Sequence, residues 1–209
     1  FSEGMAVVSL EKEWPAISAK GYVSSDGSLV VAPKYQVARK FVGGLAAMGD
    51  LGSVGIINKS GVFEIPPFFL SAGEFADGLA YVVVDGKYGF INAAGRMVIK
   101  PVFDDVRSFS EGLAWVSINK KAGFINTQGE VVIAPEYDGA FPFAEGLSAV
   151  AVGEKWGYID HDGRMVIPAV YDFANPFEHG RAKVNIGERY FFISKSGAIL
   201  EDPTCDLVP

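Results

Sequence analysis

The sequence predicts an all-β protein built from six repeats, and three observations lead to that prediction. Glycines recur every 34 residues in three separate registers along the 209-residue chain. Short runs alternate apolar and polar residues and are rich in β-branched and aromatic side chains, and no window carries a helical stripe. Turn sequences separate these runs at regular distances. We therefore expect each repeat to be a small β-sheet.

The glycine registers set the repeat boundaries. The first holds Gly21, Gly55, Gly89, Gly123 and Gly157, with Phe191 in the sixth place. The second holds Gly27, Gly61, Gly95, Gly129, Gly163 and Gly197. The third holds Gly4, Gly44, Gly78, Gly112, Gly146 and Gly180, and its first gap is 40 residues because repeat one carries an insertion around Trp14. We expect one domain over residues 1–209, with repeats at about 1–40, 41–74, 75–108, 109–142, 143–176 and 177–209.

Each repeat reads as three strands in order. It opens with Phe-x-x-Gly-Leu-Ala, as at Phe75–Ala80, and an alternating apolar run follows as the first strand. After a short polar loop comes a Gly-aromatic-Ile segment, such as Gly123-Phe124-Ile125, which we expect to be the second strand. A Val-Ile-x-Pro segment supplies the third strand. The expected unit is a three-stranded antiparallel meander.

The turns are also specified. An Asn, Asp or Ser stands three residues before the second-register glycine, as in Asn92 to Gly95, which is the chemistry of a type I turn with a left-handed glycine. The prolines Pro33, Pro67, Pro101, Pro135 and Pro203 share one register. They are expected to end the third strand, because proline cannot donate to a ladder.

One stretch carries a family resemblance. Lys155-Trp156-Gly157-Tyr158-Ile159-Asp160, with Gly163 and Pro168 after it, resembles the WG (KWG) repeat family of bacterial β-repeat proteins. The resemblance covers all six repeats and is strongest in repeats three to five, although only Trp156 supplies the tryptophan before the glycine. It implies a bacterial source and an interaction role, and it implies no catalytic activity.

The arrangement of the repeats is the next question. Propeller blades usually need about 40 residues for four strands, whereas 34 residues hold three comfortably. One face of the first strand is apolar in the middle repeats and becomes Arg181, Lys183 and Asn185 in repeat six, as a capping repeat requires. We expect an open curved array in which each repeat stacks on its neighbour, and a six-bladed β-propeller is the alternative.

Composition narrows the classes of function. A net charge of −7 and a pI near 4.9 argue against nucleic acid and anionic lipid as partners. No apolar run reaches the length of a membrane-spanning helix, so we expect no membrane insertion. A single cysteine, two histidines in unrelated registers and the lack of any catalytic spacing predict no metal site, no cofactor and no enzyme activity.

Three groups of side chains are candidates for a ligand or partner surface. A cation recurs before the aromatic-Gly pair, at Lys87, Lys121, Lys155 and Arg189. These residues form either a cationic strip or ion pairs with the acidic residues that also recur. One such acid is the Asp after the third strand, which we expect to cap a local turn.

The other two groups are aromatic. Tyr81 and Trp115 share a register and form either a platform for sugar rings or a partner, or packing under a neighbouring repeat. Trp14 lies in the insertion, where it either binds or covers the first sheet edge.

These observations favour a non-catalytic module that presents an extended β-repeat surface to a protein partner. Carbohydrate or cell-wall binding through Tyr81, Trp115 and Trp14 is the alternative. We expect a periplasmic, envelope or secreted setting.

Overall fold

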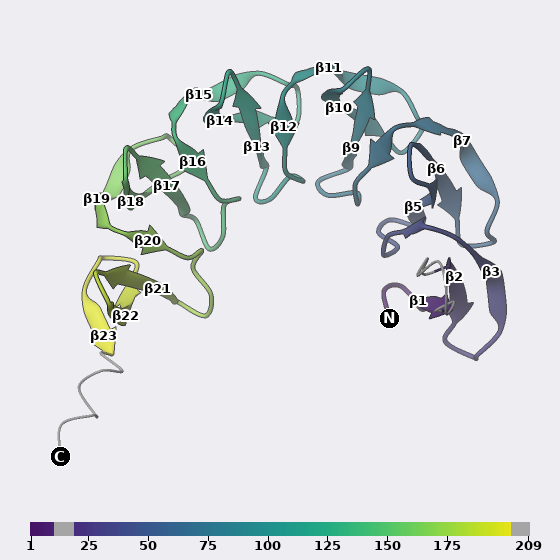
Figure 1. Cartoon of the computed structure of the whole chain (residues 1–209), viewed down its shortest axis with the longest axis horizontal. Coiled ribbons are helices and arrows are strands. Elements are labelled where there is room, and N and C mark those ends of the chain that lie inside the picture. The colour runs from purple at the N-terminus through teal and green to yellow at the C-terminus, as the bar shows by residue number, and fades with distance from the viewer. Residues whose placement is uncertain (11–18, 202–209) are drawn as a thin grey trace. The chain divides into compact units, whose positions relative to one another are not determined.

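The computed structural model describes residues 1–10 and 19–201, and every regular element in this part of the chain is a β-strand. Trp14, Pro203 and Cys205 lie outside the described residues. The chain divides into two compact units, Phe1–Phe103 and Asp104–Pro209. Each unit contains three small antiparallel sheets (Figure 1), so the all-β repeat prediction is confirmed.

In unit 1 the sheets follow the chain. The first contains β1 (Met5–Leu10), β2 (Ala19–Ser24) and β3 (Leu29–Tyr35). The second contains β4 (Val37–Ala38), β5 (Leu45–Asp50), β6 (Ser53–Asn58) and β7 (Phe63–Phe69). The third contains β8 (Ser71–Ala72), β9 (Leu79–Val84), β10 (Lys87–Asn92) and β11 (Met97–Phe103).

Unit 2 repeats the pattern. Its first sheet contains β12 (Asp105–Val106), β13 (Leu113–Ile118), β14 (Lys121–Asn126) and β15 (Val131–Tyr137). Its second contains β16 (Gly139–Ala140), β17 (Ser148–Val152), β18 (Lys155–Ile159) and β19 (Met165–Tyr171). Its third contains β20 (Phe173–Ala174), β21 (Arg181–Ile186), β22 (Arg189–Ser194) and β23 (Ile199–Glu201).

The predicted meander is present in every sheet, and five of the sheets carry an additional two-residue strand. This short strand pairs with the first long strand, as where Val106 faces Val116. It comes from residues that the sequence places at the tail of the preceding repeat, so a sheet crosses the predicted repeat boundary. Two residues are too few to show a period-two pattern, which is why alternation does not reveal the strand.

The first-register glycine lies under a bulge of the third strand. The pairing of β18 with β19 shifts between Trp156, which faces Tyr171, and Tyr158, which faces Ile167. A Cβ on Gly157 would come within 2.5 Å of the Ile167 carbonyl oxygen. Only glycine allows the two backbones to approach so closely.

The prediction that proline ends the third strand is wrong. β15 continues through Pro135 to Tyr137, and β11 continues through Pro101 to Phe103. The prolines are tolerated because they stand in the bulge of a strand at a sheet edge, where the ladder does not require their N–H.

The predicted turns are confirmed. Gly95 has φ +74° and its N–H donates to the Asn92 carbonyl oxygen at 2.9 Å. The Asn92 side-chain oxygen accepts hydrogen bonds from the N–H groups of Ala94 and Arg96. The asparagine therefore holds the turn while glycine takes the left-handed backbone.

The cores lie between sheets of successive repeats. The ring of Tyr158, on β18, packs edge-on against Phe177 of the next repeat at 4.9 Å. Phe124 packs against Phe143 at the same separation. These rings are almost fully buried, and each is worth about 1.5–3 kcal/mol of transfer free energy. One repeat therefore supplies the ring that closes the core of the repeat before it.

Candidate functional site

Two of the recurring cations lie in ion pairs. The Lys121 ammonium donates to Asp138, and the Lys155 ammonium donates to Asp172. Both members of each pair belong to the same predicted repeat. The pairing lowers the pKa of both aspartates, and backbone N–H groups lower it further.

Those backbone donors connect one sheet to the next. The Gly153 N–H, in the β17–β18 hairpin, donates to Asp138 at 2.8 Å, and the Gly187 N–H donates to Asp172. Asp104 accepts from Asn119 in the same register. The expectation of a local turn cap is wrong, because the capped N–H lies 15 residues further along the chain. The hairpin is presented to the carboxylate only when the two sheets are stacked.

A second set of carboxylates performs the same task at the Phe-x-x-Gly loops. Glu145 accepts from the Gly180 N–H at 2.9 Å and pairs with Lys195 at 3.2 Å. Glu3 accepts from the N–H groups of Gly43 and Gly44 and pairs with Lys59. These hydrogen bonds lower the pKa of both glutamates. These recurring carboxylates therefore accept hydrogen bonds from the next repeat or its hairpin and hold neighbouring repeats together.

The cations themselves occupy one structural position. Lys87, Lys121, Lys155 and Arg189 each begin the second long strand of a sheet, β10, β14, β18 and β22. Lys87 and Arg189 are exposed. The four cations therefore share one position in their sheets, two of them are held in ion pairs, and their use as a ligand surface stays a prediction.

The two candidate platform aromatics are half-buried. Tyr81, on β9, lies against Gly73, and a Cβ added to Gly73 would be 2.2 Å from the Tyr81 ring. The centroids of the Tyr81 and Tyr88 rings are 5.9 Å apart. Trp115, on β13, has the Arg107 guanidinium 5.2 Å from its ring, and its buried indole N–H finds no acceptor among the described residues. Both side chains pack within their own units, and the platform stays a prediction.

Trp156 lies in an aromatic cluster that the sequence did not predict. The Trp156 ring is 5.4 Å from Phe141 and 5.3 Å from Phe173. Phe173, on the short strand β20, is 41% exposed. Trp156 thus joins one sheet to the short strand of the next.

The third strands carry large apolar side chains that face solvent. In β19, Met165, Val166 and Val170 are 42%, 44% and 50% exposed. The same pair of positions is exposed in three other sheets, at Met97 and Val98, Val131 and Val132, and Ile199 and Leu200. We call the exposed residues named in this paragraph the third-strand apolar set. In three of these strands the next residue, Ile99, Ile133 or Ile167, is buried, and the exposed residues leave the sheet edge partly apolar.

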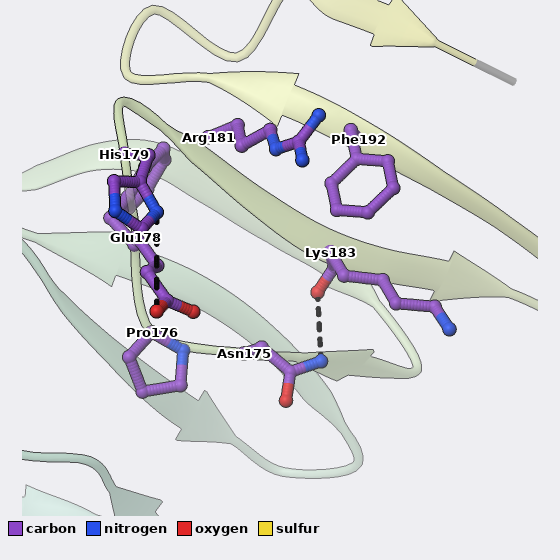
Figure 2. A pocket seen from close by; sticks show the side chains of 8 residues that line it. Asn175, Pro176, Glu178, His179, Arg181, Lys183 and Phe192 are labelled. Carbon is purple, nitrogen blue, oxygen red and sulfur yellow. Dashed lines mark hydrogen bonds and ion pairs between the residues drawn. The ribbon is translucent and has the colours of Figure 1, made fainter.

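A pocket of about 600 Å³ lies on repeat six (Figure 2). It is lined by Asn175, Pro176, Phe177, Glu178, His179, Arg181, Lys183 and Phe192. Figure 2 shows Arg181 and Lys183 on one strand, with Phe192 on the strand beside it. The sequence predicted the charged face of β21. It did not predict Phe192 or residues 175–179 as part of a site, because they come from a separate strand and a separate segment.

No group of three or more His, Cys, Asp or Glu side chains is placed to hold a metal ion among residues 1–10 and 19–201. Within the same ranges, no helix has the length and apolarity to cross a bilayer.

Comparison with solved structures finds the fold again at low sequence identity. Hsv2 from Kluyveromyces lactis, with its loop 6CD replaced by a Gly-Ser linker, is 11% identical with a TM-score of 0.51, covering 76% of this chain and 62% of that one. The same protein with the complete loop is 12% identical, and this chain spans 59% of its length. The extracellular domain of a one-component system from B. thetaiotaomicron is 10% identical with a TM-score of 0.51, covering 93% of this chain and 34% of that one. At such identities the likeness shows the fold alone.

Comparison with protein families identifies the repeats themselves. No curated protein sequence matches the chain. The model of the WG-containing repeat matches five times in tandem, at residues 21–48, 55–88, 88–121, 123–156 and 156–190. The five tandem matches and the six small sheets together make this a repeat-containing all-β domain. The chain belongs to the family of WG-containing repeat proteins.

Proposed function

We propose that this chain is a non-catalytic module that binds a protein partner through the third-strand apolar set. The observation that carries the proposal is the exposure of large apolar side chains at the same positions of successive sheets, as at Val131, Val132, Met165 and Val166. Single exposed apolar residues are ordinary, but a set repeated along one kind of edge favours a protein interface.

The chemistry of the edge supports side-chain contacts over strand addition. β15 and β19 stand at the edges of their sheets, but each contains a proline, Pro135 or Pro168, and a bulge. Proline removes a backbone donor and a bulge disturbs the regular ladder that an added strand would need. The partner is therefore expected to cover methyl and thioether groups and not to extend the sheet.

Site-specific photo-crosslinking tests the proposal. A benzophenone amino acid at Val166 should capture one partner in cells that produce the protein, whereas the same group at Gln128, an exposed turn residue, should not. The captured partner, once purified, should bind the wild-type chain. Val166→Lys should weaken that binding about tenfold or more, and Gln128→Lys should leave it within about twofold.

The same purified chain addresses carbohydrate binding. A glycan array and a peptidoglycan pull-down, with Trp115→Ala as the control, separate the two classes of ligand. Saturable glycan binding that depends on Trp115, together with no partner captured at Val166, would replace the protein partner by a sugar.

A further inference from the structure

The pocket on repeat six occupies a position that receives an aromatic ring on earlier repeats. Phe124 of repeat four receives Phe143, and Tyr158 of repeat five receives Phe177, with ring centroids 4.9 Å apart in both cases. Phe192 is the next member of this series, 34 residues after Tyr158. It lines the pocket and is only half-buried, whereas Phe124 and Tyr158 are fully buried. The floor of the pocket is thus the receiving side of a ring-on-ring contact that the fold repeats.

The walls differ from those of the earlier contacts. Arg181 and Lys183 replace Leu147 and Ala149, which are buried in repeat five, and both are exposed. The Arg181 guanidinium lies 4.7 Å from the centre of the Phe192 ring, and the Lys183 ammonium lies 4.7 Å from the ring of Tyr190 (Figure 2 shows the first pair). The pocket therefore combines a place for an aromatic ring with two permanent cations.

The rim contributes less charge. His179 Nδ1 is 4.0 Å from a Glu178 carboxylate oxygen, and both side chains are largely exposed. The Asn175 amide donates to the Lys183 carbonyl oxygen, which orients the loop. Among the residues that line the pocket, Glu178 is the one carboxylate, and Arg181 and Lys183 are two cations.

We propose that this pocket binds a segment of a protein partner in which an aromatic side chain is flanked by carboxylates. The aromatic ring would lie on Phe192, as Phe177 lies on Tyr158, and the carboxylates would pair with Arg181 and Lys183. The inference rests on the proposed function, in that the ligand is a protein, but it uses a different surface.

Physical alternatives fit the pocket less well. In repeat five, Leu147 and Ala149 share a buried cluster with Phe177. A purely apolar segment over Arg181 and Lys183 would take two charged groups out of water and bring no carboxylate with it. A small inorganic anion would leave the ring unused. A volume of about 600 Å³ suits a short peptide segment.

Fluorescence anisotropy with the full chain tests the proposal. The probe is a fluorescein-labelled Ser-Glu-Phe-Glu-Ser peptide, with the Phe→Ala and the Glu→Gln peptides as matched probes. Lys183→Glu should weaken binding about tenfold or more, and Lys120→Glu, an equal charge change in an exposed hairpin of the same unit, should change it less than about twofold. Phe192→Leu should abolish the preference for Phe over Ala in the probe, and added salt should weaken binding.

Each other outcome counts against the inference. Circular dichroism first shows that the variants are folded. Binding that does not saturate by about 1 mM peptide, or that weakens equally in Lys183→Glu and Lys120→Glu, overturns the proposed site. A uronic acid oligosaccharide that displaces the peptide and binds more tightly reassigns the pocket to carbohydrate and overturns the peptide. Loss of peptide binding with capture at Val166 retained removes this inference alone, whereas the converse removes the proposed function of the third-strand apolar set.

Discussion

At the scale of single residues, the structure explains why glycine recurs at fixed positions of the repeat. At Gly157 the Ile167 carbonyl oxygen and the Ala169 nitrogen occupy the space that a side chain would need. Gly153 is different, since it has φ +61° and open space around it. Two glycines of one repeat are thus required for different physical reasons.

This difference predicts unequal costs of substitution. Gly157→Ala should lower the free energy of unfolding by about 3 kcal/mol, because a backbone must move. Gly153→Ala should cost about 1 kcal/mol, since only left-handed strain is introduced. Urea denaturation measures both values, and equal losses would show that the bulge does not press on Gly157.

Acid should weaken the fold through the carboxylates that join repeats. The pKa values of Glu3, Asp138, Glu145 and Asp172 are lowered in the folded chain, so folding favours their charged forms. Their contribution is complete above the ordinary carboxyl pKa of about 4 and is lost as the pH falls below it.

Thermal melting between about pH 6 and pH 2.5 checks this sign. The melting temperature should fall on acidification, and Asp172→Asn should reduce the fall relative to wild type. Glu136→Gln, at an exposed carboxyl on β15, serves as the control. A wild-type melting temperature that is flat or rises below pH 4 would contradict the assignment.

At the scale of elements, a hydrogen bond from a hairpin N–H to a carboxylate joins successive sheets of unit 2. Asp172 follows β19, holds Lys155 of its own sheet and accepts the Gly187 N–H from the β21–β22 hairpin. The aspartate therefore serves two sheets at once, while the lysine serves one.

Removing the Asp172 side chain should lower the melting temperature more than removing the Lys155 side chain. Asp172→Ala loses both contacts and leaves the Gly187 N–H without its acceptor, so its drop in melting temperature should be roughly twice that of Lys155→Ala. The double variant should resemble Asp172→Ala, because the lysine has nothing left to pair with. A Lys155→Ala variant that is the more damaging of the two would refute this order.

The sequence predicts those elements that depend on the alternation of apolar residues and on turn residues close together in the chain. The strands, the Asn92–Gly95 type of turn and the repeat period follow from alternation and turn chemistry, which act within a few residues. The short strand at Asp105–Val106, the passage of β15 through Pro135 and the 15-residue reach of Asp138 depend on which sheet lies beside which, and no local pattern records that.

The candidate site follows the same division. The cation before the aromatic-Gly pair and the charged face of β21 can be read from the sequence, because they stand in register. The pocket around Phe192 and the clustering of Trp156 with Phe141 and Phe173 require the fold, since the residues come from separate strands and loops.

At the scale of the whole molecule, stability within each unit comes from cores shared by successive repeats. In unit 2, one cluster joins Phe124, Ile133 and Tyr137 of one repeat to Phe143 and Ile159 of the next. In unit 1, another joins Tyr22 of the first repeat to Phe41, Met48 and Ile57 of the second. Cooperation between neighbours is what stacked repeats require, because a sheet of this size cannot bury its own face.

Hydrogen exchange on Phe143→Leu tests this claim most directly. Phe143 lies in repeat five but packs on Phe124 of β14 in repeat four, and leucine should keep the fold at a cost of about 1.5 kcal/mol. The account predicts faster amide exchange in β14 and β15 as well as in β17 and β18. Faster exchange confined to β16–β19, with β14 and β15 protected as in wild type, would contradict a core shared between repeats.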